Sequence, residues 1–362
     1  MKPRMPGKSL FANVVLFLAA SLLTILLLEG IARVVLRRDF GQGLLIGDPL
    51  LELTPRGPRL RPDQRLDWPS PLSRRTVRLK TNAQGFRGPA IAPEKSRPRL
   101  LVLGDSIAFG AGVEDRDTWP RQLEQSLAGR VEVINAGIPD LGTQEELNLL
   151  REEGPRLKPD LVLVAYYLND SLPPYSFSQE YGAMSPTRAG WITRMRQTSY
   201  LFRWLWERYL VTHYVKSSGR GTGPWVRLFQ QGDWRHTPAA FQELVQKADS
   251  DFGAAWTPAG WQALPSQLQQ IQDWAVRHQA RITVVAFPVS IQVEAEFLDD
   301  FPQQKLGQIC LELGIPYLDL LPALRPRAEQ ELFFDQCHLT PAGAAATAQA
   351  IARFLVGQGL LP

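Results

Sequence analysis

The sequence has few of the residues on which metal and disulfide chemistry depend. Its 362 residues include only two cysteines, Cys310 and Cys337, and four histidines. Two cysteines are too few for a disulfide framework or a thiolate metal cage, which leaves either one bridge outside the cytoplasm or two unpaired core residues. The histidines are scattered, and neither an HExxH nor a CxxC motif occurs. We therefore expect no metal ion and no other cofactor.

The chain also lacks an excess of charge beyond its first 40 residues. The formal net charge is +4, and the last 322 residues hold 34 basic and 34 acidic side chains. Neither a GxxxxGK(S/T) nor a GxGxxG phosphate-binding motif is present. The concentration of positive charge in the first 40 residues argues for a membrane anchor and against a nucleic-acid partner. The N-terminal basic residues are Lys2, Arg4, Lys8, Arg33, Arg37 and Arg38.

One long apolar run is present near the N-terminus. At about 1.5 Å per residue, residues 10–28 nearly cross a hydrocarbon core of about 30 Å. We predict a cytoplasmic tail at 1–9 and a transmembrane signal anchor at 10–36, in which Glu29 pairs with Arg33 one turn later. A cleaved signal peptide remains the alternative, because Gly30-Ile31-Ala32 fits a cleavage site. Both interpretations place the following domain outside the cytoplasm, in the periplasm or at the cell surface.

The rest of the chain divides into a stem and a domain. Residues 37–97 are proline-rich and are predicted to form an irregular, membrane-proximal stem that packs on the domain. Over 98–362, short apolar runs alternate with helical stretches, which is typical of buried parallel strands joined by right-handed crossovers. We therefore predict a three-layer α/β/α domain with a central parallel sheet of about five strands. The predicted strands are Leu100–Leu103, Val131–Ile134, Leu161–Tyr166, Ile282–Phe287 and Ile315–Leu318, with helices at Trp119–Leu127 and Gln144–Leu157 among the connections.

The regular spacing breaks once, between the third and fourth predicted strands. Residues 171–258 are rich in tryptophan and contain a Gly/Ser-rich loop, so we predict a helical insertion there. Within it, residues 200–214 form an aromatic helical stretch. The plainer interpretation is a helix packed on the domain. A lid or a membrane-interface helix remains open, since Trp and Tyr favour that boundary.

Polar residues stand where the predicted strands end, which is where sites form in open α/β sheets. Ser106 follows the first strand, Gly137 the second and Asn169 the third. A serine hydroxyl needs a base to accept its proton, and of the four histidines only His338 has an acid, Asp335, just before it in a turn. A helix start at Thr340 and Pro341 would hold this turn in place.

Four short sequence blocks contain these residues: one each around Ser106, Gly137 and Asn169, and one with Asp335 and His338. They resemble the four blocks of the SGNH, or GDSL, hydrolase family over about residues 98–357. The resemblance implies that Ser106 is the nucleophile and that His338 and Asp335 complete a Ser-His-Asp triad. It also implies that the backbone N–H group of Ser106, together with Gly137 and Asn169, forms an oxyanion hole. The implied substrate is an acyl ester, and membrane-anchored relatives make an O-acetylated cell-envelope glycan or a lipid credible.

The sequence departs from the family pattern at two positions. Tyr167 stands where glycine is usual, two residues before Asn169, and we expect it to narrow the substrate entrance or add a contact there. Ile107 replaces the usual leucine, which should affect packing only. We expect Asp105 to support the nucleophile loop by hydrogen bonds. Asp319, at the end of another predicted strand, is the rival to Asp335 as the acid of the triad.

Three functions fit this set of residues. Water as acceptor makes the protein a serine esterase, which we prefer, and a sugar hydroxyl as acceptor makes it a glycan O-acyltransferase. A non-catalytic envelope protein that binds glycan through the same fold is the third. A complete nucleophile and base argue against the third, because binding alone requires neither.

Overall fold

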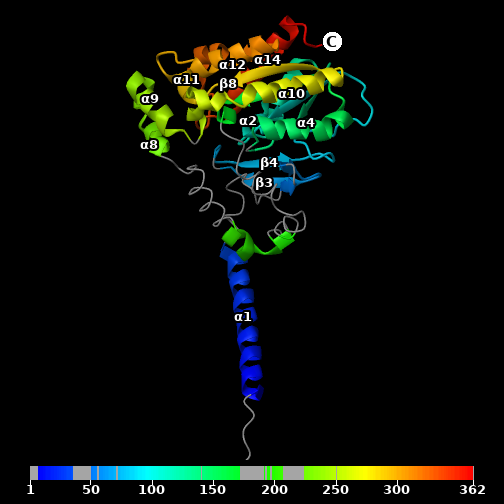
Figure 1. Ribbon diagram of the computed structural model, residues 1–362, viewed down its shortest axis with the longest axis vertical. Coiled ribbons are helices and arrows are strands. Elements are labelled where there is room, and N and C mark those ends of the chain that lie inside the picture. Colours follow the sequence, from blue (N-terminus) through cyan, green and yellow to red (C-terminus); the bar gives the residue numbers. More distant parts are fainter. Residues whose placement is uncertain are drawn as a thin grey trace, which may run out of the picture.

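The computed structural model describes residues 7–35, 50–54, 57–70, 72–139, 141–171, 191, 194–195, 198–206, 224–249 and 251–361. Figure 1 shows a long isolated helix below a layered α/β unit. The helix, α1, spans Gly7–Val35. An 18-residue window within its stretch Phe11–Val35 has a mean hydropathy of 2.5, and none of that window is buried by the rest of the protein. By length and composition it is compatible with a membrane anchor or a signal sequence.

The predicted five-stranded parallel sheet is confirmed. Its strands are β5 (Arg99–Gly104), β6 (Glu132–Asn135), β7 (Leu161–Tyr167), β8 (Arg281–Phe287) and β9 (Tyr317–Asp319). They lie in the order β6-β5-β7-β8-β9, and all four pairings are parallel. β5, β6 and β7 are buried along their whole length. This is why the middle of each strand reads as an apolar run and not as an alternating pattern, with the buried polar residues Arg99, Glu132 and Asn135 at the ends of β5 and β6.

Helices cover both faces of the sheet. α3 packs on α14, while α4 packs on α10 and α10 on α12, which gives one helical layer on each side. The described α-helices of this unit are α2 (Ser106–Phe109), α3 (Trp119–Ser126), α4 (Thr143–Leu157), α8 (Pro224–Gln231), α9 (Pro238–Lys247), α10 (Leu264–Arg277), α11 (Ser290–Glu294), α12 (Phe301–Leu313), α13 (Leu321–Leu324) and α14 (Pro341–Gly357). The described 3₁₀ helices are η2 (Asp115–Asp117), η3 (Leu168–Ser171), η4 (Asp233–Arg235), η5 (Phe252–Trp256), η6 (Pro258–Trp261) and η7 (Arg325–Gln330).

The stem is not irregular, and that prediction is wrong. It contains two antiparallel hairpins, β1 (Leu51–Thr54) with β2 (Gly57–Leu60) and β3 (Arg65–Pro69) with β4 (Thr76–Lys80). In β4 exposed and buried residues alternate, so that Val77 and Leu79 face the core. This period of two was present in the sequence, but the surrounding prolines concealed it.

The described end of the predicted insertion is helical and packs into the core of the domain. Trp234 and Phe241 are at most 1% exposed. Trp261, just beyond the predicted insertion, stacks on Tyr166 at the end of β7, with ring centroids 5.9 Å apart. Of the aromatic stretch 200–214, the structure describes residues 200–206, which are helical, and the remainder lies outside the described residues.

Candidate active site

The predicted site residues gather where the strand order reverses. β5 and β7 are neighbours in the sheet, although β6 lies between them in sequence. Such a switch point opens a crevice outside the carboxyl ends of the strands, because the connections leave in opposite directions. Ser106 follows β5 directly, and Asn169 lies in η3, directly after β7. The topology therefore brings together residues that are 63 positions apart in the chain.

Ser106 is the first residue of the short helix α2. Asp105 caps this helix, since its Oδ1 accepts a hydrogen bond from the Ile107 N–H at 2.8 Å. The first N–H groups of a helix have no partner within the helix. Because Ser106 is the first residue of α2, its N–H points out of the N-terminal end of that helix. Asp105 is 2% exposed and acts as the structural support that we expected. The cap fixes the backbone that presents the serine hydroxyl.

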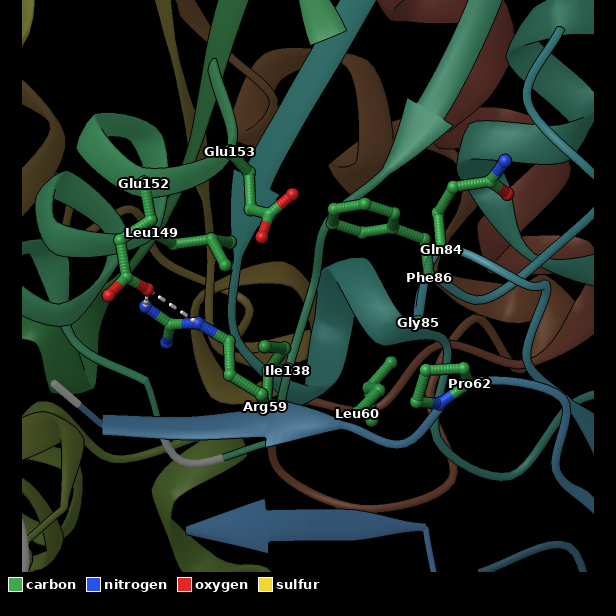
Figure 2. A pocket seen from close by; sticks show the side chains of 10 residues that line it. All are labelled: Arg59, Leu60, Pro62, Gln84, Gly85, Phe86, Ile138, Leu149, Glu152 and Glu153. Atoms are coloured by element: carbon green, nitrogen blue, oxygen red, sulfur yellow. Dashed lines mark hydrogen bonds and ion pairs between the residues drawn. The ribbon is translucent and has the colours of Figure 1, made fainter. Parts of the chain in front are cut away.

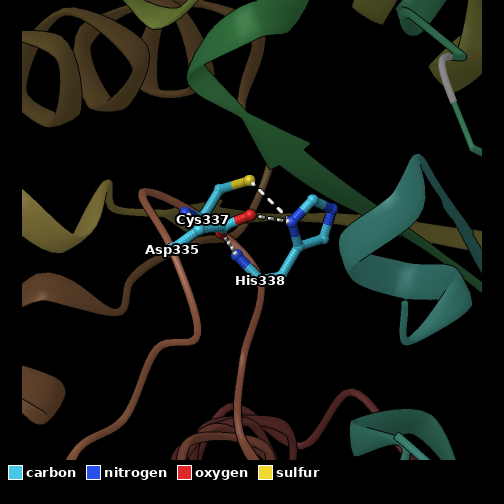
Figure 3. A group of neighbouring side chains, drawn as sticks. All are labelled: Asp335, Cys337 and His338. Carbon is cyan, nitrogen blue, oxygen red and sulfur yellow. Dashed lines mark hydrogen bonds and ion pairs between the residues drawn. The ribbon is translucent and has the colours of Figure 1, made fainter. Parts of the chain in front are cut away.

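His338 and Asp335 reach Ser106 from the other end of the chain. The Nε2 atom of His338 lies 2.9 Å from the Ser106 Oγ, and its Nδ1 lies 2.7 Å from the Asp335 Oδ2. Asp335 also accepts the backbone N–H of His338 at 2.8 Å through Oδ1, which closes the turn seen in Figure 3. Thr340 then caps α14 by accepting the Gly343 N–H at 3.2 Å, as the sequence predicted.

The electrostatics of this pair suit a general base and its orienting acid. Burial favours a neutral imidazole, but the Asp335 carboxylate and its hydrogen bond outweigh burial and raise the pKa of His338 above 6.5. Burial by itself would raise the pKa of Asp335. His338 and the two backbone N–H groups of Cys337 and His338 instead hold that pKa below its usual value. A carboxylate whose ionised form is favoured beside an imidazole is the arrangement of an acid that orients a general base.

Cys337 lies within this turn and was not singled out from the sequence for the site. Its Sγ is 3.5 Å from the His338 Nδ1, and burial raises the pKa of the thiol well above its usual value. Asp335, Cys337 and His338 place their ligand-type atoms within 4.8 Å of one another, as a metal site would. Two of these atoms, the Asp335 Oδ2 and the His338 Nδ1, already form a hydrogen bond with each other. Both cysteines are free thiols, which excludes a bridge between Cys310 and Cys337 in this structure.

The two other predicted oxyanion donors differ in their surroundings. The side-chain Oδ1 of Asn169 is buried and has no hydrogen-bond partner among the described residues. Oδ1 is an acceptor, so an oxyanion role for this side chain requires its Nδ2 group, the donor of the amide. The Gly137 N–H, in contrast, donates to the Asn135 Oδ1 at 3.0 Å. Gly137 therefore does not offer a free N–H in this structure, because the asparagine ending β6 takes it.

Tyr167 does not line an entrance in this structure. It is 1% exposed, and burial raises the pKa of its hydroxyl well above the usual value. The side chain packs behind the catalytic turn, near Cys337, where a glycine would leave a void. Contact between Tyr167 and a substrate would therefore require a change of structure.

Two acids are buried beside the nucleophile loop. Glu146 on α4 is not exposed, and neither of its carboxyl oxygens has a hydrogen-bond partner among the described residues. Burial, then repulsion from Asp105, raises its pKa well above the usual value. The pKa of Asp170 is raised by burial and by Glu146 in the same way. Burial and their mutual repulsion thus favour the neutral form of these two carboxyl groups.

Arg87 was not predicted as a site residue, yet it holds the segment that follows the nucleophile. Its guanidinium donates to the carbonyls of Phe109, Gly110 and Val113 at 2.9, 2.7 and 2.6 Å and to Asp115 at 2.8 Å. Its side chain is 1% exposed, so each of these acceptors depends on it. The sequence signal was an arginine in the turn-rich end of the stem.

Two hollows differ in what they contain. One of about 420 Å³ lies between β2, the turn at Gly85 and α4, where Arg59 bonds to Glu152 (Figure 2). None of its lining residues is a nucleophile paired with a base. The other, of only about 10 Å³, is lined by Ser106 and His338 together with Trp119. Of these two hollows, the smaller one is where a hydroxyl and an imidazole meet.

A family model described as the GDSL-like lipase/acylhydrolase family matches residues 102–346, more than half of the chain. The chain belongs to this family. Membership supports an acyl ester hydrolase and agrees with the predicted SGNH resemblance. No curated protein matches the chain significantly.

Solved structures of similar proteins include three esterases. A lipase/acylhydrolase from Enterococcus faecalis is 16% identical, with 72% of this chain and 96% of that chain covered and a TM-score of 0.39. A carbohydrate acetylesterase family member from Sinorhizobium meliloti is 14% identical, with coverages of 73% and 99% and a TM-score of 0.37. A two-domain esterase active on acetylated mannans is 13% identical, with coverages of 72% and 49% and a TM-score of 0.37. At these values the family model alone carries the assignment.

Proposed function

We propose that this GDSL-family protein hydrolyses an acyl ester through an acyl-enzyme on Ser106. The observation that carries the proposal is the continuous chain from the Ser106 Oγ through His338 to Asp335, with links of 2.9 and 2.7 Å. His338 accepts the hydroxyl proton as the Oγ attacks the carbonyl carbon, and then donates it to the leaving alcohol. Water then attacks the acyl-enzyme. His338 accepts a proton from this water and donates one to the Ser106 Oγ as the carboxylic acid leaves. The Ser106 N–H and the Asn169 amide stabilise the oxyanion.

The small hollow at the nucleophile favours a short acyl group. Gly110, Val113 and Trp119 close the space beside Ser106, and about 10 Å³ remains there. An acetyl ester makes fewer demands on this space than a long acyl chain. With an uncleaved α1 as anchor and the domain outside the cytoplasm, an O-acetylated glycan or lipid of the cell envelope is the substrate class we propose.

Fluorophosphonate labelling of the full chain in detergent tests the nucleophile. We expect one labelled site in the wild type and none in Ser106→Ala, with turnover of p-nitrophenyl acetate lost in the same variant. Ser266→Ala is the control, because Ser266 also lies in the first turn of a helix, α10, but its hydroxyl accepts a hydrogen bond from Gln270 and not one from a histidine. An unlabelled wild type without turnover would favour the glycan-binding alternative.

An ester panel then separates the finer possibilities. We expect turnover to fall as the acyl chain lengthens from acetyl, and acetylated sugars to be deacetylated. If acetyl appears on an added sugar acceptor faster than free acetate is released, the protein is an acyltransferase and not a hydrolase.

A further inference from the structure

The end of α1 nearest the domain carries a half-buried acid, Glu29, whose hydrogen-bond partners come mostly from a distant segment. The Glu29 carboxylate accepts hydrogen bonds from the Ser199 hydroxyl at 2.7 Å and from the backbone N–H groups of Tyr200 and Leu201 at 2.9 and 3.0 Å. Its side chain is 17% exposed, and it also pairs with Arg33 at 2.9 Å, the pair that the sequence predicted. Four donors satisfy a charge that would otherwise be costly next to a hydrocarbon layer.

Arg33 reinforces the same contact one turn further along α1. Its guanidinium donates to the Thr198 carbonyl at 2.8 Å and lies over the ring of Tyr200, 5.3 Å from the centroid. Residues 198–206 are therefore attached to α1, more than 160 positions away in the sequence. Figure 1 shows this described segment across the upper end of α1.

The position of Glu29 along α1 sets the depth of the segment. Eighteen residues separate Phe11 from Glu29, which corresponds to about 27 Å of helix. The hydrocarbon core of a bilayer is about 30 Å thick. If α1 crosses the membrane from Phe11, Glu29 and the segment docked on it lie at the far interface.

The exposed side chains of the segment match that interface. Trp191 and Leu205 are 55% and 51% exposed, and Trp204 is 37% exposed. Trp191 packs edge-on against Phe202, with centroids 5.5 Å apart. Amphipathic aromatic rings and isolated aliphatic side chains are favourable at the boundary between headgroups and acyl chains and unfavourable in water.

We propose that residues 198–206, with Trp191, form an interfacial membrane-binding segment that Glu29 and Arg33 of α1 dock at the outer boundary of the bilayer. The partner is the lipid surface of the same membrane that α1 crosses. The described part of the aromatic stretch is thus bound to the anchor helix α1 and not only to the domain. This inference rests on the proposed membrane span, and it is independent of the proposed ester chemistry.

Lipid quenching of a single label tests the segment in the full chain. Leu205→Cys is labelled with a nitrobenzoxadiazole maleimide, while Cys310 and Cys337 are at most 4% exposed and should not react. The protein is placed in phosphatidylcholine/phosphatidylglycerol vesicles containing lipid with a nitroxide near the top of the acyl chain. We expect strong quenching at 205, close to that of a label at Leu27→Cys on α1. A label at Leu311→Cys, 81% exposed on α12, is the matched control and should be quenched several-fold less.

Glu29→Ala separates docking from simple proximity. This change makes α1 more apolar, so quenching at 27 should persist, whereas quenching at 205 should fall because three hydrogen bonds to the segment are lost. Quenching at 205 no stronger than at 311 would overturn the interfacial segment, and unchanged quenching at 205 in Glu29→Ala would overturn its docking. An unquenched label at 27 would overturn the span and this inference with it. These experiments do not measure ester turnover, so their outcome does not depend on whether the proposed hydrolysis occurs.

Discussion

At the residue scale, His338 is the side chain on which the proposed chemistry depends. It has to be neutral to accept the Ser106 proton, yet Asp335 raises its pKa above 6.5. Because the pKa of His338 is raised, this base becomes protonated, and so cannot accept a proton, already in mildly acidic solution. The gain is an imidazolium that is stabilised at the moment the acyl-enzyme forms.

This balance predicts the pH dependence of turnover. We expect kcat/KM for a p-nitrophenyl ester to fall as pH falls, with an apparent pKa above 6.5, because the protonated imidazole cannot act as base. Asp335→Asn should lower kcat by about 10⁴ and move the acidic limb to lower pH. Asp319→Asn, the rival acid at the end of β9, should leave the position of this limb unchanged. The opposite pattern would assign the acid of the triad to Asp319.

Asn169 carries a second prediction at this scale. Asn169→Ala should lower kcat by about 10²–10³ and leave KM nearly unchanged, because the amide contacts the oxyanion and not the ground-state ester. Asn148→Ala on α4, also a half-buried asparagine, is the matched control and should keep wild-type kcat. A change in KM alone would show that Asn169 binds substrate without stabilising the transition state.

At the scale of elements, the placement of α2 decides whether the nucleophile meets its base. α2 has only four residues, so its position comes from its neighbours and not from its own helical stability. Gly137 packs beneath it, and a Cβ there would lie 2.3 Å from the Phe109 nitrogen and 2.6 Å from the Ala108 carbonyl carbon. The glycine that the family resemblance suggested for the oxyanion hole is thus explained by close packing.

Gly137→Ala should therefore displace α2. We expect a loss of about 1–3 kcal/mol in the free energy of unfolding, as for other overpacked sites, together with a fall in kcat. Thermal unfolding and ester turnover measure the two effects. Gly357→Ala at the end of α14 is the control, since a Cβ there would meet nothing within 4 Å. A Gly137→Ala variant with normal stability but lost kcat would restore the oxyanion role of its N–H.

Arg87 supports the same element from the stem. Arg87→Lys keeps the charge but cannot reach three carbonyls and Asp115 at once, which leaves buried acceptors unpaired. We expect a loss of about 1–3 kcal/mol in stability and a lower kcat with little change in KM. Arg78→Lys, whose side chain is 80% exposed beside Glu114, should change neither quantity. Retained kcat at full stability would limit Arg87 to a dispensable contact.

At the scale of the whole molecule, the stem and the α/β unit share one hydrophobic core. Leu50, Leu60, Trp68 and Phe86 are at most 5% exposed and belong to the same buried cluster as the central sheet. The predicted boundary between residues 97 and 98 therefore passes through packed side chains. A functional unit that omits the stem would expose these contacts to water.

Truncation tests this view. A chain that begins at residue 50 keeps both hairpins and Arg87, and we expect it to fold and to hydrolyse p-nitrophenyl acetate. A chain that begins at residue 98 loses the core contacts and the support of α2, and we expect aggregation or inactive protein. Circular dichroism and turnover distinguish the two. An active chain from residue 98 would establish the stem as an independent spacer.

The sequence by itself determined the elements whose signals are local. Short apolar runs predicted the five strands of the sheet, Thr340 and Pro341 predicted the start of α14, and four short blocks predicted the family. Contacts between distant segments were decided only by the tertiary structure, because sequence spacing contains no information on which surfaces meet. Arg87 reaches the Phe109 carbonyl in α2, His338 meets Ser106 across 232 positions, and Glu29 binds residues 199–201. The partners in each contact come from separate parts of the chain, and only the fold supplies that geometry.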